Sequence, residues 1–364
     1  MEKNEILAIY GDDPETMSRR IAEEAGLESL IGDRRKRVGL KPNLVVSRTA
    51  DGGATTHPEI ARGLIGYLQS HGFTDVTILE GSWVGDDTDQ AFKVCGYKQL
   101  AEETGVAIIN LQKDTAHPRD CRGMKIEICD AACDVDFMIN LPVLKGHCQT
   151  LVTCALKNNK GVISNREKRR FHTLGLHQPI AHLNAVAKND FILVDSICGD
   201  LDFEEGGNPV PAGRLFGSRD PVLCDAWGAT LLGYRADEIP YIGLAEKLGI
   251  GCGNPKQARI RELNHSSQGA LFPRPQGRVR ERARYIREDK ACSACYAGLV
   301  FALSRITQNE LSRLKEPISI GQGFKGKKGT LGVGQCAANF AAFCGGCPPN
   351  AREIADFLQA VISR

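Results

Sequence analysis

The sequence is poor in aromatic residues, almost neutral in net charge and free of long apolar runs. Phe, Trp and Tyr together make up 6% of its 364 residues. Lys plus Arg exceed Asp plus Glu by only 46 − 44 = 2, so no overall positive field attracts nucleic acid or an anionic membrane. The longest apolar runs, such as Ala297–Leu303, are far too short to span a bilayer.

Several sequence signals of targeting and catalysis are missing as well. The start of the chain, Met-Glu-Lys, lacks the apolar segment of a secretory signal. No Gly-x-Ser-x-Gly elbow, P-loop or His-Glu-x-x-His helix is present, which argues against the corresponding hydrolases, NTPases and zinc peptidases. We therefore expect a cytoplasmic protein with no membrane or nucleic-acid partner. The sequence leaves its oligomeric state open.

Strand-like and helix-like segments alternate over residues 1–233. The helical stretches are Pro14–Leu30, His57–His71 and Asp87–Glu103. The strand-like runs are rich in Val and Ile and are bounded by turn-forming residues: Glu5–Tyr10, Arg37–Leu44, Asp75–Leu79, Ala107–Leu111, Asp136–Val143 and Phe191–Val194. Repeated strand–helix units predict an α/β fold, with a mostly parallel open sheet and helices on both faces.

The length of the chain favours more than one domain. We expect the α/β domain over residues 1–250 and a linker rich in Gly, Pro and Arg over 251–290. A small cysteine-rich module is expected over residues 291–364.

The chain contains 14 cysteines, and the spacing of those near the C-terminus indicates a metal centre. In a reducing compartment a disulfide framework is not expected, and buried thiols account for many of the others. The C-terminal group reads Cys292-Ser-Ala-Cys295, then Cys336, then Cys344-Gly-Gly-Cys347-Pro-Pro. Two close pairs of this kind supply four soft ligands, which suit zinc or an iron–sulfur cluster.

The Cys-Pro step and the many glycines of this module favour a 4Fe–4S cluster. We predict Cys292, Cys295, Cys336 and Cys347 as its ligands, with Cys344 as the spare thiol. Structural zinc and a redox dithiol are the alternatives. The spacing alone does not decide between Cys336 and Cys344.

Ionisable residues end several of the predicted strands. Because the carboxyl ends of parallel strands share one edge, where ligands bind in open α/β sheets, we expect these residues to converge on one cleft. They are Lys41, Glu80, Lys145, His147 and Asp195.

A strongly cationic segment follows His147. From Lys157 to Arg170 there are six cationic side chains and one acidic one, a set that suits a carboxylate or phosphate ligand. We expect Lys157, Lys160 and Arg166 to hold such an anion, although a solvated surface is the simpler explanation. His147 and His172 are candidates for proton transfer, because imidazole titrates near neutral pH.

At these residues the sequence resembles the domain of unknown function 362 family over about residues 1–235. The motifs that carry the resemblance are Lys41-Pro-Asn43, Glu80-Gly-Ser82, Leu141-Pro-Val-Leu-Lys145-Gly-His147, Leu156-Lys157-Asn158 with Lys160-Gly161, and Asp195-Ser. The resemblance implies an α/β fold and a ligand cleft that includes Asn43, Ser82 and Asn158. It also implies a distant likeness to the lactate racemase superfamily, in which a lysine and two histidines act around a carboxylate, roles that here would fall to Lys145, His147 and His172.

Two classes of function follow from these features. The first is an iron–sulfur oxidoreductase that delivers single electrons to an anionic substrate or to a bound flavin, with a ferredoxin-like protein as the electron donor. The second is a non-redox isomerase or lyase that acts on a carboxylate and has a structural cluster. An electron carrier without a small substrate is a third interpretation.

Overall fold

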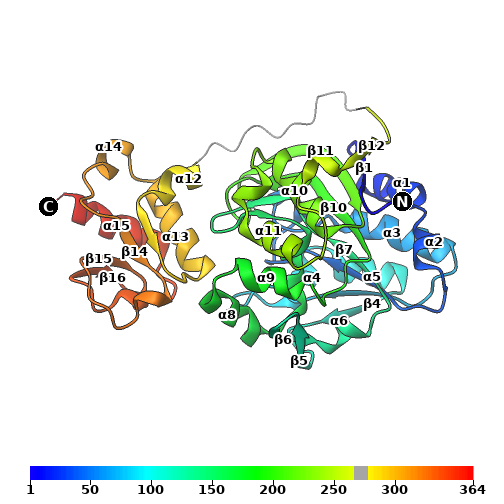
Figure 1. Cartoon of the computed structure of the whole chain (residues 1–364), viewed down its shortest axis with the longest axis horizontal. Helices are drawn as coiled ribbons and strands as arrows, with labels where there is room; N and C mark the ends of the chain where they lie inside the picture. The colour runs from blue at the N-terminus through cyan, green and yellow to red at the C-terminus, as the bar shows by residue number, and fades with distance from the viewer. Residues whose placement is uncertain (266–277, 364) are drawn as a thin grey trace. The chain divides into compact units, whose positions relative to one another are not determined.

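The computed structural model describes residues 1–265 and 278–363. These residues form two compact units, the first from residues 1–169 and 177–265 and the second from 170–176 and 278–363. The first unit extends past residue 250, where the sequence pattern placed the start of a linker. The reason is that Arg259–Glu262 forms a strand, β12, which pairs in parallel with the N-terminal strand Glu5–Tyr10, β1 (Figure 1).

An eight-stranded, mostly parallel sheet forms the centre of the first unit. Its spatial order is β12, β1, β11 (Pro209–Ser218), β10 (Phe191–Asp200), β7 (Phe137–Leu141), β2 (Val38–Pro42), β3 (Val76–Glu80) and β4 (Ala107–Asn110). Strand β11 runs antiparallel to both of its neighbours, and every other neighbouring pair is parallel. The α/β fold expected from the sequence is therefore confirmed, with one antiparallel strand inserted.

Helices cover both faces of this sheet. One face packs on a continuous apolar core that includes Leu40, Leu64, Ile78 and Leu193, below α1 (Pro14–Ala25), α2 (Leu27–Ile31), α3 (Pro58–Ser70), α4 (Thr88–Val94) and α5 (Tyr97–Thr104). Phe216 of β11 points to the opposite face and meets the ring of Trp227 edge-on at 4.8 Å. That face carries α7 (Ala155–Asn158), α9 (His177–Leu183), α10 (Pro221–Leu231) and α11 (Pro240–Lys247) (Figure 1).

Two helices that the sequence pattern predicts as continuous are each divided by a glycine. Gly26 has a φ of 64° and Gly96 a φ of 80°, and this left-handed conformation ends one helix before the next begins.

Short elements complete the first unit. The hairpins β5–β6 and β8–β9 comprise Ala116–Cys121 with Met124–Cys129, and Lys145–His147 with Leu151–Thr153. The short helices are η1 (Ala50–Gly52), α6 (Asp130–Asp134), η2 (Asn159–Val162), η3 (Ala236–Glu238) and η4 (Pro255–Gln257), and α8 (Asn165–Leu174) has residues in both units.

The second unit contains a small parallel sheet of four strands (Figure 1), β13 (Ile286–Glu288), β14 (Ile318–Ile320), β15 (Leu331–Val333) and β16 (Ala342–Cys344). Its helices are α12 (Arg278–Ala283), α13 (Ser293–Ser304), α14 (Gln308–Leu311), η5 (Gln322–Phe324), η6 (Gln335–Ala337) and α15 (Ala351–Ile362). Helix α13 packs against α15. Among the described residues of both units, no helix has the length and apolar character needed to cross a membrane.

Candidate functional site

A buried ion pair joins the ends of two neighbouring strands. Lys41 Nζ on β2 lies 2.8 Å from Glu80 Oε2 on β3, and their side chains are 0% and 3% exposed. The backbone N–H of Gly81 donates to Glu80 Oε1 at 2.7 Å. Gly161 passes so close that a Cβ there would lie 2.0 Å from the same oxygen. The strand-end pattern therefore brings Lys41 and Glu80 together, and Gly161 is a glycine because no side chain fits.

A second buried group centres on Glu204, which follows β10. Glu204 Oε2 lies 2.5 Å from His147 Nε2 and 3.0 Å from Lys157 Nζ. His147 Nδ1 accepts hydrogen bonds from the backbone N–H groups of Gln149 and Thr150, so the proton of the neutral ring is on Nε2 and faces Glu204.

The charges of this group follow from its burial. Burial is the main cause that lowers the pKa of His147 to about 4, even though Glu204 acts in the opposite direction. Burial also opposes ionisation of Glu204, but His147 and Lys157 hold the pKa of its carboxyl well below the usual range. At neutral pH the site therefore contains a carboxylate, a neutral imidazole with a fixed tautomer and the Lys157 side chain.

Lys145 lies beside this group, on β8. Its Nζ donates to the carbonyl oxygens of Ala54 and Glu204, and it has no carboxylate partner among the ion pairs of the described residues. Burial and the nearby charge of Lys157 lower the pKa of Lys145 to about 7. An amine with this pKa exchanges a proton readily near neutral pH, so it can act as a base or as the cation that meets an anion.

Two further lysines lie in the same region. Lys168 Nζ donates to the carbonyl oxygens of Gly81 and Ser82, at 3.0 and 2.8 Å, and burial lowers its pKa to about 8. Burial and the charge of Lys157 lower the pKa of Lys160 to about 7, and in the described part of the chain its Nζ has no hydrogen-bond partner.

The balance of charges favours an anionic ligand. Lys41 is paired with Glu80, and Lys157 with Glu204, but neither Lys145 nor Lys160 has a carboxylate of its own in the described part of the chain. Burying unpaired ammonium groups is costly, and a bound anion would remove that cost. We call Lys145, Lys157, Lys160 and Lys168 the lysine site.

Asp195 pairs with His57, a residue that the pattern of strand ends does not include. Its Oδ2 lies 2.7 Å from His57 Nδ1 and accepts the His57 backbone N–H at 2.9 Å. Burial opposes a charge on His57, but the attraction and hydrogen bond of Asp195 outweigh it and raise the pKa of His57 to about 11. His57, which directly precedes α3, is therefore an imidazolium, and its positive charge balances the negative charge of Asp195.

The polar residues of the family motifs mainly order the backbone. Asn158 Nδ2 donates to Asn140 Oδ1 at 2.7 Å and to the carbonyl oxygen of Lys41 at 3.3 Å. Asn43 Oδ1 accepts the N–H of Val45. Ser82 Oγ donates to the carbonyl oxygen of Leu44 at 2.7 Å. These bonds fix the turns that follow the strands.

One of the expected site residues, Arg166, lies outside this arrangement. Arg166 is 79% exposed and forms a surface ion pair with Glu127 of β6, because helix α8 presents it to solvent. His172 belongs to the second unit. The lysine site is thus built without Arg166, whereas the role of His172 stays a prediction.

Sequence reasoning did not single out Glu204, His57 or Lys168. Glu204 lies in the loop that follows β10, where Asp200 accepts the backbone N–H groups of Asp202, Phe203 and Asn208. An acidic residue just past a predicted strand was the available signal, but the strand was expected to end at Val194.

In the second unit, four cysteines approach one another. Cys292 precedes α13 and Cys295 lies in its first turn, Cys336 lies in η6, and Cys347 follows Gly346, whose φ is 122°. Burial raises the pKa of Cys295 to about 12, and the nearby Cys292, Cys347 and Cys336 act in the same direction.

The fifth cysteine, Cys344, differs from these four. Burial and the charge of Glu353 raise its pKa, and no other cysteine among the described residues contributes to the shift. The ligand set expected from the sequence, Cys292, Cys295, Cys336 and Cys347, stays a prediction.

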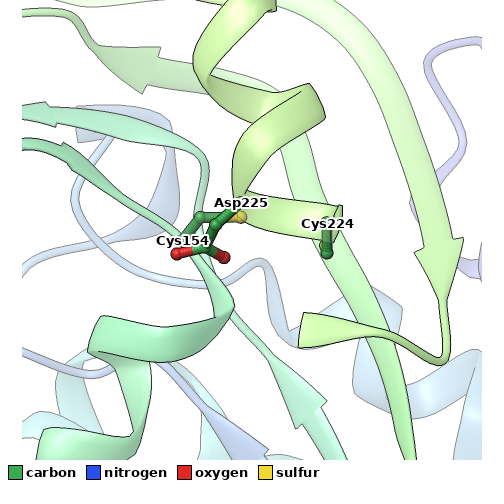
Figure 2. A group of neighbouring side chains, drawn as sticks. All are labelled: Cys154, Cys224 and Asp225. Atoms are coloured by element: carbon green, nitrogen blue, oxygen red, sulfur yellow. The ribbon is translucent and has the colours of Figure 1, made fainter. Parts of the chain in front are cut away.

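The Cys154, Cys224 and Asp225 group lies in the first unit (Figure 2). All three residues are fully buried. Cys154 directly precedes α7, and the other two residues lie on α10.

Comparison with known proteins gives distant relatives. The chain is 24% identical over 234 residues to the "Thylakoid-associated protein sll1697" of Synechocystis sp., a match that covers 62% of this chain and 70% of that protein. Among solved structures it is similar to the lactate racemase apoprotein from Thermoanaerobacterium thermosaccharolyticum, with 15% identity, a TM-score of 0.40, and coverage of 64% of this chain and 57% of the other. A Thermotoga maritima protein matches with 16% identity and a TM-score of 0.33, over 50% of this chain and 51% of its own. The chain thus spans little more than half of each solved structure.

The family comparison covers more than half of the chain. Residues 38–230, which are 193 of the 364 residues, match the family described as a domain of unknown function, DUF362. The matched segment includes Lys41, Glu80, Lys145, Lys157 and Glu204, whereas the four cysteines of the second unit lie beyond it. This chain belongs to the DUF362 family.

Proposed function

We propose that this protein is an iron–sulfur oxidoreductase whose first unit binds a small carboxylate or phosphate anion at the lysine site. The observation that carries the proposal is the approach of Cys292, Cys295, Cys336 and Cys347, with Cys344 apart. When bound, a 4Fe–4S cluster supplies one-electron transfer.

The residues of the first unit would bind and orient the anion. Lys145 and Lys160 lack carboxylate partners in the described chain, so they offer their charge to a ligand. Glu204 holds Lys157 and His147 in place. His147 remains neutral, and its proton stays on Nε2. Lys145, with a pKa of about 7, can give or take one proton near the ligand.

Anaerobic purification followed by iron, sulfide, zinc and flavin assays tests the proposal. We expect about four irons and four sulfides per chain, as one 4Fe–4S cluster requires, and a visible absorption band that bleaches on reduction. A protein that carries zinc at these cysteines, or that shows no reducible chromophore after reconstitution with iron and sulfide, would contradict it.

A non-redox isomerase is the second candidate, and the state of Lys145 and His147 favours it. A buried amine with a pKa of about 7 and a neutral imidazole can move a proton at the carbon next to a carboxylate without any electron donor. Incubation of candidate 2-hydroxy acids in deuterium oxide, without a reductant, separates the two functions. Deuterium at the α-carbon supports the isomerase, and its absence together with a reducible cluster supports the oxidoreductase.

A further inference from the structure

We propose that Cys154, Cys224 and Asp225 form a second metal site, which binds one zinc ion inside the first unit and ties α7 to α10. Their ligand atoms all lie within 4.8 Å of one another, and each residue has an exposure of 0%. Figure 2 shows Cys154 on the segment that enters α7, beside Asp225 on α10. The inference is independent of the cluster proposed for the second unit.

The carboxylate of Asp225 is only half satisfied by the protein. Its Oδ1 accepts the backbone N–H of Leu156 at 3.3 Å, whereas Oδ2 is buried without a hydrogen-bond partner in the described chain. The Cys154 thiol, the Ala155 backbone N–H and the Tyr241 hydroxyl are also close to the carboxylate, but the Tyr241 hydroxyl directs its single proton to the carbonyl oxygen of Val152. An unpartnered buried carboxylate oxygen is rare and costly, and a divalent cation would satisfy it.

The two thiols also differ from three other buried cysteines of the unit. Cys95, Cys129 and Cys198 each donate to a backbone carbonyl oxygen, as isolated buried thiols commonly do. In the described part of the chain, Cys154 and Cys224 make no such bond to a carbonyl oxygen, and Cys154 instead interacts with Cys224 and with Asp225. Two thiolates and one carboxylate are a ligand set that zinc accepts, with water at the fourth position.

The position of the site gives it a structural role. Cys154 is the residue before α7, which carries Lys157 of the lysine site, and Asp225 already holds the N–H of Leu156. Gly228 of α10 lies beside Cys154, since a Cβ at Gly228 would be in ordinary contact with its Sγ at 3.7 Å. A metal bonded to both segments would hold the start of α7 against α10.

Zinc analysis of the full chain tests the proposal. We expect about one zinc ion per chain after dialysis against a weak chelator, and a loss of roughly tenfold or more in Cys224→Ser and Asp225→Asn. Cys95→Ser is the matched control, because it removes a buried thiol of the same unit, and Cys295→Ser separates this zinc from metal bound in the second unit. Zinc that persists in Cys224→Ser but disappears in Cys295→Ser would overturn the assignment.

A second measurement does not depend on whether the variants fold. Anomalous diffraction from wild-type crystals at the zinc absorption edge should give a peak among Cys154 Sγ, Cys224 Sγ and the Asp225 carboxylate. Crystals of zinc-supplemented protein with no anomalous peak at this position would refute the site.

Discussion

Lys41 and Glu80 are 39 residues apart in sequence, yet their charged atoms meet at 2.8 Å with almost no access to solvent. The two residues lie at the ends of β2 and β3, which are parallel neighbours in the sheet. Gly161 packs directly against both side chains. Neither charge can be rehydrated if the other is removed, so the pair should behave as one unit.

Replacement of one partner should therefore be much more harmful than replacement of both. We expect Lys41→Met to lower the free energy of unfolding by about 3–5 kcal/mol, because Glu80 is left charged and unpaired. Lys41→Met combined with Glu80→Leu should recover much of that loss. Urea unfolding of the single and double variants measures the coupling, and strictly additive effects would contradict the pair's role.

Alanine substitution can test how closely Gly161 packs against Lys41 and Glu80, with an unconfined glycine as the control. We expect Gly161→Ala to destabilise the protein by about 1–3 kcal/mol, because its Cβ would lie 2.0 Å from Glu80 Oε1 and 2.7 Å from Lys41 Nζ. Gly243→Ala in α11 is the control, since nothing lies within 4 Å of an added Cβ there, and it should stabilise the helix by roughly 0.5–1 kcal/mol. Equal effects of the two substitutions would show that Gly161 is not confined in this way.

The charge of His57 should persist far above the usual titration range of histidine. Because its pKa is raised from 6.5 to about 11 in the folded protein, the pair with Asp195 contributes its full stability below pH 6.5 and loses it as the pH rises through 11. NMR of ¹⁵N-labelled histidine should show a His57 imidazolium at pH 9. In Asp195→Asn the ring should be neutral at that pH, and a wild-type His57 that titrates near 6.5 would contradict the pairing.

Anion binding at the lysine site should weaken as the pH rises. Burial lowers the pKa of Lys145 and of Lys160 to about 7, so both amines are charged below neutral pH and lose their protons above it. The groups around Lys145 are Lys157, Glu204, Asp200 and Glu205. With malonate as the probe, we expect the Kd to rise roughly tenfold between pH 6 and pH 9, as the loss of a charged hydrogen bond implies.

Calorimetry in two buffers of different ionisation enthalpy checks this directly. Binding at pH 7.5 should take up protons, because the anion favours the charged amines. Lys160→Met should weaken binding, whereas Lys113→Met, whose side chain is 69% exposed elsewhere on the unit, should leave it unchanged. An affinity that does not vary with pH would argue against the lysine site.

Single substitutions can test which cysteines of the second unit bind iron. Serine at Cys292, Cys295, Cys336 or Cys347 should deplete iron, because each removes one of four ligands. Cys344→Ser should retain it, since no neighbouring cysteine influences that thiol among the described residues. Full iron in Cys336→Ser with loss in Cys344→Ser would move the fourth ligand to Cys344.

The sheet was largely predictable because its strands are short apolar runs with clear boundaries. β1 begins and ends at the residues expected from the sequence. Strand β11 was not predicted, because Pro209–Ser218 contains two prolines and two glycines and has the composition of a loop. The antiparallel pairing with β1 and β10 overrides that local preference.

The candidate site was predictable where strand topology determines it. Lys41 and Glu80 meet because their strands are parallel neighbours. Glu204 was not predictable in the same way, since its position depends on a loop that Asp200 closes through three backbone N–H groups. The partner of Asp195 likewise depends on where α3 begins, which the strand pattern alone does not determine.

The order of the sheet has a consequence for the newly synthesised chain. Strand β1 leaves the ribosome before the other strands of the sheet, but its partners in the described sheet are β11 and β12, with Ile6 opposite Ser218 and Ile260. More than 200 residues must be translated before either edge of β1 can be paired. Until then Ile6, Leu7 and Ala8, all fully buried in the finished protein, remain an unpaired apolar edge that can aggregate or bind a chaperone. The nascent protein should therefore be most vulnerable between the emergence of β1 and that of β11.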